Sequence, residues 1–176
     1  MRWMWIDTVL EFEPERRLVA IKNCSLAEEH LHDHFAADSF GDADPVMPSS
    51  LLIEGSAQTA GILVGSVGKF REKVVLAKIV SASIEDEVRP GQSVRYSAAL
   101  DRIDPAGAAA SVSIERWDHR RPEWVNIGAI EFVFSFLDQN RGGHEFPEEN
   151  FVFGENFRTI LQGNGLDRVA EPDPIA

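Results

Sequence analysis

The sequence predicts an α+β fold in which an antiparallel sheet wraps around one long buried helix. The first observation is an apolar run from Leu51 to Val67 that is hydrophobic on almost every helical face, and such a helix is buried rather than amphipathic. The second is the alternation of apolar and polar residues in the later segments, which is typical of half-buried strands. One sheet beside one such helix must cover it.

The bulk composition fits one globular domain and limits the classes of partner. The chain has 176 residues, of which 44% are hydrophobic and 26% are charged, and its formal net charge is -12. This charge disfavours binding to nucleic acid and to anionic membrane surfaces. The lone Cys24 allows no intramolecular disulfide and is predicted to be a buried spacer. Asp7 and Glu11 interrupt the N-terminal apolar run too early for a secretory signal, so a cytoplasmic protein is expected.

Two strands are predicted before the helix, over residues 3–12 and 17–22, with a turn between them. The polar segment 25–48 carries three histidines, and a short helix near Leu26–Leu31 followed by a loop is expected there. The long helix should begin after Pro48, where the hydroxyls of Ser49 and Ser50 can cap free N–H groups. Its small residues should permit close packing against the sheet, and Gly68 should end it.

The remainder reads as four antiparallel strands over residues 74–88, 93–104, 108–117 and 124–137, with a turn at residues 89–92. Residues 1–137 are thus expected to form the domain, and residues 138–176 a partly helical extension with a helix at 155–162 and a disordered end from residue 171. This extension would cover a tunnel mouth or form an oligomer contact. Exposed edge strands predict a dimer.

The segment Pro45-Val46-Met47-Pro48-Ser49-Ser50-Leu51-Leu52-Ile53-Glu54-Gly55-Ser56-Ala57-Gln58 resembles the core motif of bacterial 3-hydroxyacyl-[acyl-carrier-protein] dehydratases. Residues 77–79 and 88–92 also look like that family's third strand and following turn. The resemblance covers roughly residues 3–137. It implies a hotdog fold, a homodimer and active sites at the dimer interface, with Glu54 as a catalytic residue.

The position of the family's catalytic histidine is not matched directly. At the family's spacing it would fall on Phe40, whereas a histidine–phenylalanine pair occurs as His34-Phe35, six positions upstream. An insertion within Ala36–Asp44, a small and acidic stretch suited to a loop, reconciles the two and makes His34 the catalytic histidine. In the competing alignment Phe40 occupies the position and the site lacks its histidine. A further departure is Ser49, which stands where the family has glycine.

These residues could carry out the dehydration of a 3-hydroxyacyl thioester. His34 would remove a proton from C2 and Glu54 would protonate the hydroxyl leaving C3. Burial of Glu54 favours the neutral acid, while the helix N-terminus favours the anion. Backbone N–H groups of Ser49 and Ser50 would bind the thioester carbonyl. Gln58, one turn after Glu54, would orient its carboxyl group.

Other interpretations stay open. Glu54 could be purely structural, and His34 could be a surface residue. His30, His32 and His34 alternate as zinc ligands can, but no distant ligand completes a site, so neither a metal nor a cofactor is expected. Thioesterase activity and non-catalytic acyl binding are the alternative functions.

The expected partners are an acyl carrier protein or CoA thioester and a second copy, with a trimer of dimers as the alternative assembly. A local basic patch could dock an acidic carrier protein, or could be ordinary charged surface. Its candidate members are Lys69, Arg71, Lys73, Lys78 and Arg89.

Overall fold

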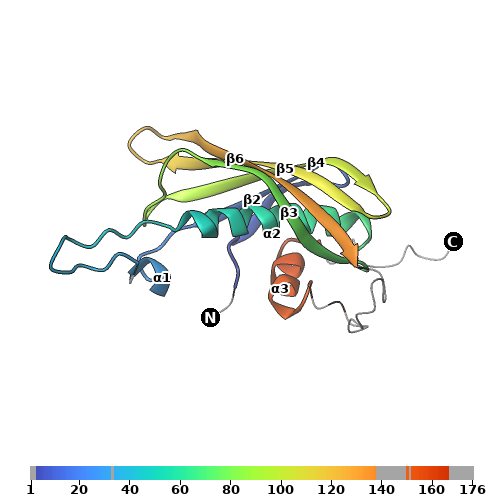
Figure 1. The fold of residues 1–176 in the computed structure, drawn as a ribbon, viewed down its shortest axis with the longest axis horizontal. Coiled ribbons are helices and arrows are strands. Elements are labelled where there is room, and N and C mark those ends of the chain that lie inside the picture. The colour runs from blue at the N-terminus through green and yellow to red at the C-terminus, as the bar shows by residue number, and fades with distance from the viewer. Residues whose placement is uncertain (1–2, 33, 138–149, 151, 167–176) are drawn as a thin grey trace.

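The computed structural model of the chain describes residues 3–32, 34–137, 150 and 152–166. Six antiparallel strands form one sheet in the order β1-β2-β4-β5-β6-β3. The long helix α2 lies along one face of this sheet, and α3 lies on the opposite side of α2 from β4 and β5 (Figure 1). In chain order the elements are β1 (Thr8–Glu13), β2 (Arg17–Asn23), α1 (Glu29–His32), α2 (Ser49–Val67), β3 (Lys73–Ile84), β4 (Ser93–Asp104), β5 (Gly107–Asp118), β6 (Glu123–Leu137) and α3 (Glu155–Gly163).

Helix α2 forms the centre of the core, as its sequence predicts. Most of its residues are buried, and the inward side chains of β4 pack against it, with Tyr96 fully buried. Gly55 permits this approach, because a Cβ at that position would lie 2.6 Å from the Tyr96 hydroxyl. Gly68 ends the helix, as expected. The predicted fold is therefore confirmed around its central element.

Three element boundaries differ from the prediction by three residues or more. The first strand begins at Thr8 rather than Trp3, because the backbone N–H of Trp5 donates to the side chain of Gln58 instead of to a neighbouring strand. β3 ends at Ile84 rather than Val88, because Val88 is fully buried and its carbonyl accepts from the Met47 N–H. Helix α1 begins only at Glu29.

The predicted capping of α2 by serine side chains is wrong. Pro48 is the N-cap and no side chain hydrogen-bonds to the free N–H groups. Ser49 and Ser50 lie inside the first turn and are exposed. The Pro48 carbonyl instead accepts from the N–H groups of Leu51 and Leu52, at 2.9 and 3.4 Å.

The C-terminal helix was predicted within one residue of its observed bounds. The expected disorder from residue 171 falls outside the described residues. Among the described helices, none is long and apolar enough to cross a membrane.

Candidate active site

Glu54 and Gln58 occupy one face of α2, one turn apart, as the sequence predicts. Glu54 is partly buried, and Gln58 is only 5% exposed. The Gln58 Nε2 group donates to Glu54 Oε1 at 2.9 Å. Because an amide N–H bond to a carboxylate fixes the rotation of that group, Gln58 orients the carboxyl of Glu54.

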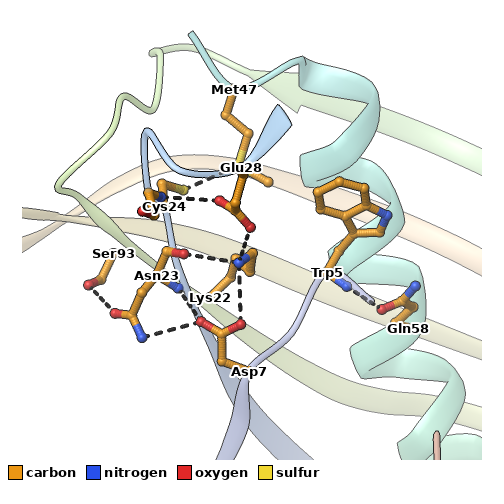
Figure 2. Close-up of polar contacts among 10 residues, drawn as sticks. Trp5, Asp7, Lys22, Asn23, Cys24, Glu28, Met47, Gln58 and Ser93 are labelled. Atoms are coloured by element: carbon orange, nitrogen blue, oxygen red, sulfur yellow. Dashed lines mark hydrogen bonds and ion pairs between the residues drawn. The ribbon is translucent and has the colours of Figure 1, made fainter. Parts of the chain in front are cut away.

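The N-terminal segment before β1 completes the surroundings of Glu54. Trp3 Nε1 donates to Glu54 Oε1 at 3.1 Å, and Gln58 Oε1 accepts from the Trp5 N–H at 2.9 Å (Figure 2). Gln58 Nε2 also donates to the Trp3 carbonyl at 3.2 Å. The sequence analysis missed Trp3 as a site residue, because nothing local pairs it with a residue 51 positions away.

A largely apolar pocket of about 190 Å³ begins at Glu54. Glu54 and Gln58, which are hydrogen-bonded to each other, are its two polar lining residues, and the others are apolar. In the described hydrogen bonds of Glu54, only Oε1 takes part, so Oε2 is available to a ligand. The pocket is lined by Glu54, Ala57, Gln58, Gly61, Val74, Leu76, Phe134, Val152, Phe153 and Phe157.

His34 lies in the segment that leads into α2 and is partly buried. Its Nδ1 is 3.0 Å from the Val46 carbonyl oxygen. A carbonyl only accepts, so Nδ1 carries the proton of the neutral ring and Nε2 carries the free lone pair. A ring held in this tautomer can act as a general base through Nε2. Within one chain, the described hydrogen bonds do not join His34 to Glu54: His34 bonds to Val46, whereas Glu54 bonds to Trp3 and Gln58.

The stretch after His34 is a closed loop. Its ends meet where the Asp44 N–H donates to the Phe35 carbonyl at 2.9 Å, and an inner turn forms where Asp38 N–H donates to the Gly41 carbonyl at 3.0 Å. Phe40 is 95% exposed. A loop closed at its neck can be inserted without moving the residues on either side, which favours His34 over the Phe40 position.

An ion cluster around the buried Lys22 fixes the chain near this site. Lys22 is 3.3 Å from Asp7 and 2.7 Å from Glu28 (Figure 2). Burial by itself lowers the pKa of Lys22, but the hydrogen bond and charge of Glu28 and the charge of Asp7 outweigh it and raise that pKa. The cluster joins the entrance of β1 to the turn before α1, where Trp5 packs edge-on against His30 at 4.7 Å. These contacts therefore fix the Trp3–Trp5 segment and the segment that carries His34 relative to each other.

The other residues predicted from the sequence differ in how well the structure fits their expected roles. Ser49 and Ser50 lie at the exposed start of α2, where N–H groups have no partner within the helix. In the suggested basic patch, Lys73 is buried at 7% exposure and Arg89 is paired with Asp44 and Glu87. The patch as predicted is thus incomplete. Within the described ranges, no cluster of three or more histidine, cysteine or acidic side chains could hold a metal ion.

The FabA-like domain model matches residues 2–117. The 3-hydroxyacyl-[acyl-carrier-protein] dehydratase FabZ of Ligilactobacillus salivarius is 35% identical over 99 residues, which make up 56% of this chain and 66% of that relative.

Two solved structures share the architecture at low identity. The dehydratase heterocomplex ApeI:P from Xenorhabdus doucetiae has a TM-score of 0.59 and 13% identity, covering 77% of this chain and 84% of that one. An acyl-CoA hydrolase mutant from Staphylococcus aureus in complex with coenzyme A has a TM-score of 0.54 and 14% identity, covering 89% and 94%. These neighbours confirm the hotdog fold. The family-model match over residues 2–117 shows that the chain belongs to the FabA-like family.

Proposed function

We propose that this protein dehydrates 3-hydroxyacyl thioesters to trans-2-enoyl thioesters in fatty-acid synthesis. The observation that carries the proposal is the carboxyl of Glu54, oriented by Gln58 and Trp3 in a largely apolar pocket. Such a pocket suits an acyl tail whose reacting carbons lie at the carboxyl. The family and the relatives named dehydratase support this reaction.

In the proposed mechanism, His34 Nε2 takes the proton from C2 of the substrate. Glu54, in its protonated form, gives a proton to the hydroxyl on C3, the C3–O bond breaks, and water leaves as the C2–C3 double bond forms. The N–H groups of Ser49 and Ser50 donate hydrogen bonds to the thioester carbonyl oxygen while negative charge develops on it. The tautomer of His34 supports its role as the base.

We further propose a homodimer in which His34 of one subunit serves Glu54 of the other. The dimer is supported by β3, an edge strand with most of its length exposed. Leu76, Ile79 and Val80 on it are 42%, 41% and 50% exposed. An edge strand with one side unpaired and with exposed apolar side chains is a ready site for pairing with a second copy. A trimer of such dimers is the larger assembly consistent with the proposal.

The substrate carrier in this proposal is an acyl carrier protein or CoA, and the location is the cytoplasm. The location is supported by the single buried free thiol of Cys24, which suits a reducing compartment. We assign residues 1–137 to the hotdog domain and 138–176 to a C-terminal extension.

The test of the two catalytic roles is hydration of a crotonyl thioester, the reverse reaction, by the full chain. Glu54→Gln and His34→Ala should each lower kcat by about a hundredfold or more, because general acid–base groups contribute on that scale. Matched controls are Glu123→Gln at an exposed position and His32→Ala near His34, and both should keep wild-type rates. A wild-type rate in Glu54→Gln or His34→Ala removes that residue from the mechanism.

The shared site has a test of its own. When Glu54→Gln and His34→Ala chains are unfolded and refolded together, a site built from two subunits is intact once in each mixed dimer. About a quarter of wild-type activity should then return, since random pairing makes half of the dimers mixed. Failure of mixed dimers, shown to be present by mass spectrometry, to regain activity would place both groups in one subunit.

The alternative functions give different results with the same protein. A thioesterase releases free thiol from acyl-CoA without hydrating the enoyl thioester, and a non-catalytic subunit binds acyl thioesters but does neither. Either result would overturn the proposal.

A further inference from the structure

One wall of the pocket is a single face of α2. Glu54, Ala57, Gln58 and Gly61 line it, at a spacing that places all four side chains on one side of a helix. From Glu54 to Gly61 this face runs about 10 Å along the helix axis. Gly61 leaves the pocket wide, because a Cβ there would meet only Phe134 Cε1, at 3.9 Å.

The C-terminal segment also contributes to the pocket. Val152, Phe153 and Phe157 are among its lining residues. Phe153 is buried and lies directly over Gly65, where a Cβ would collide with its ring. Phe153 also packs edge-on against Phe70 and Phe157, with ring centroids 5.0 and 5.7 Å apart. The helix face that begins at Glu54 therefore ends against packed aromatic rings.

Hydrogen bonds of Asn150 and Asn164 anchor this segment at both ends. Asn150 Nδ2 donates to the carbonyls of Phe70 and Glu72, both at 2.9 Å. At the other end, Asn164 Oδ1 accepts from the Thr8 hydroxyl at 2.8 Å and from the Val9 N–H at 3.0 Å. Two such anchors hold the aromatic rings in a fixed position relative to the helix face.

We infer that Phe153 and Phe157 form the end wall of the acyl-binding pocket and limit the length of acyl chain that the protein accepts. The inference rests on the proposed function for the identity of the occupant, since an acyl tail runs away from the reacting carbons at Glu54. The pocket is apolar along this path, so each methylene that fits gains burial and each that meets the rings does not.

The experiment compares kcat/KM of the full chain for trans-2-enoyl thioesters from crotonyl to hexadecenoyl. Phe157→Ala should raise kcat/KM for chains beyond the wild-type limit relative to the crotonyl value of the same variant, by roughly fourfold for each additional buried methylene. Gly61→Ala should act in the opposite direction and shorten the accepted chain. Phe157 is partly exposed, so its truncation should be tolerated better than that of the buried Phe153.

The matched control is Ile160→Ala. Ile160 is buried at 8% exposure on the same helix and does not line the pocket, so its truncation should lower stability and leave the chain-length profile unchanged. The inference is overturned by an unchanged profile in both Phe157→Ala and Gly61→Ala, or by Ile160→Ala moving the profile as Phe157→Ala does.

Binding provides a readout that is independent of turnover. Isothermal titration with saturated acyl-pantetheine thioethers of increasing length should show the same limit and the same displacement of it in Phe157→Ala. If the wild-type chain binds them with a length limit but hydrates no enoyl thioester, the proposed function fails and the end wall stands. If it hydrates crotonyl thioester and the chain-length limit is the same in Phe157→Ala and Gly61→Ala as in wild type, only the end-wall inference fails.

Discussion

Replacement of Gln58 by methionine isolates the hydrogen bonds that join α2 to the N-terminal segment. Methionine has nearly the same volume and is apolar, so little cavity or overpacking follows. The change removes the acceptor of the Trp5 N–H and the donor to the Trp3 carbonyl and Glu54 Oε1. Gln58 is 5% exposed, so water does not readily replace it.

The cost of Gln58→Met follows from those three bonds. The Trp5 N–H, whose bond to Gln58 is buried, loses its acceptor, at a cost of about 1–3 kcal/mol. The Trp3 carbonyl and Glu54 are more accessible, and their lost bonds contribute about 1 kcal/mol together. We expect a loss of about 3 kcal/mol in the free energy of unfolding. For a domain of this size that is a fall in Tm of roughly 10 °C.

The assay is urea unfolding followed by tryptophan fluorescence, with crotonyl-thioester hydration measured on the folded protein. Loss of the bond that orients Glu54 should lower kcat about tenfold with little change in KM, since a hydrogen bond to a charged group is worth about 1.5 kcal/mol. The control is Gln162→Met, at an exposed position of α3, which should remain within about 0.5 kcal/mol of wild type. A Gln58→Met protein as stable as this control would refute the reasoning.

Three further changes test other parts of the structure. Gly55→Ala should destabilise by about 2 kcal/mol in urea unfolding, because the new Cβ meets the buried Tyr96 ring; Tyr96→Phe, which removes a hydroxyl with no partner among the described residues, should restore part of this loss, and no restoration contradicts the clash. Burial raises the pKa of Cys24 to about 12, so native protein at pH 8 should react with a thiol reagent about a thousandfold more slowly than unfolded protein. The folded chain holds this thiol proton more tightly than the unfolded chain. The contribution of Cys24 to the free energy of unfolding is therefore fully present below the ordinary pKa of 9.0 and is lost as pH rises towards about 12; Cys24→Ala should lack this decline. Val80→Lys on the β3 edge should shift sedimentation from dimer to monomer while the circular dichroism spectrum is retained, and an unchanged dimer would exclude this edge.

The sequence by itself predicted the central features because they depend on local pattern. The apolar run from Leu51 to Val67 is hydrophobic on almost every helical face, which is typical of a buried helix. Glu54 and Gln58 are one turn apart, so their hydrogen bond follows from helix geometry. Alternation placed Tyr96 and its neighbours on the inward face of β4.

Only the tertiary structure decided what surrounds those residues. Trp3 contacts Glu54 across 51 positions, and Phe153 and Phe157 line the same pocket as Glu54 from the C-terminal segment. No periodicity links such distant segments, because their pairing depends on where the folded sheet and loops bring each backbone. Where the first strand begins was decided in the same way, since the Trp5 N–H donates to Gln58, 53 positions away, and not to a neighbouring strand.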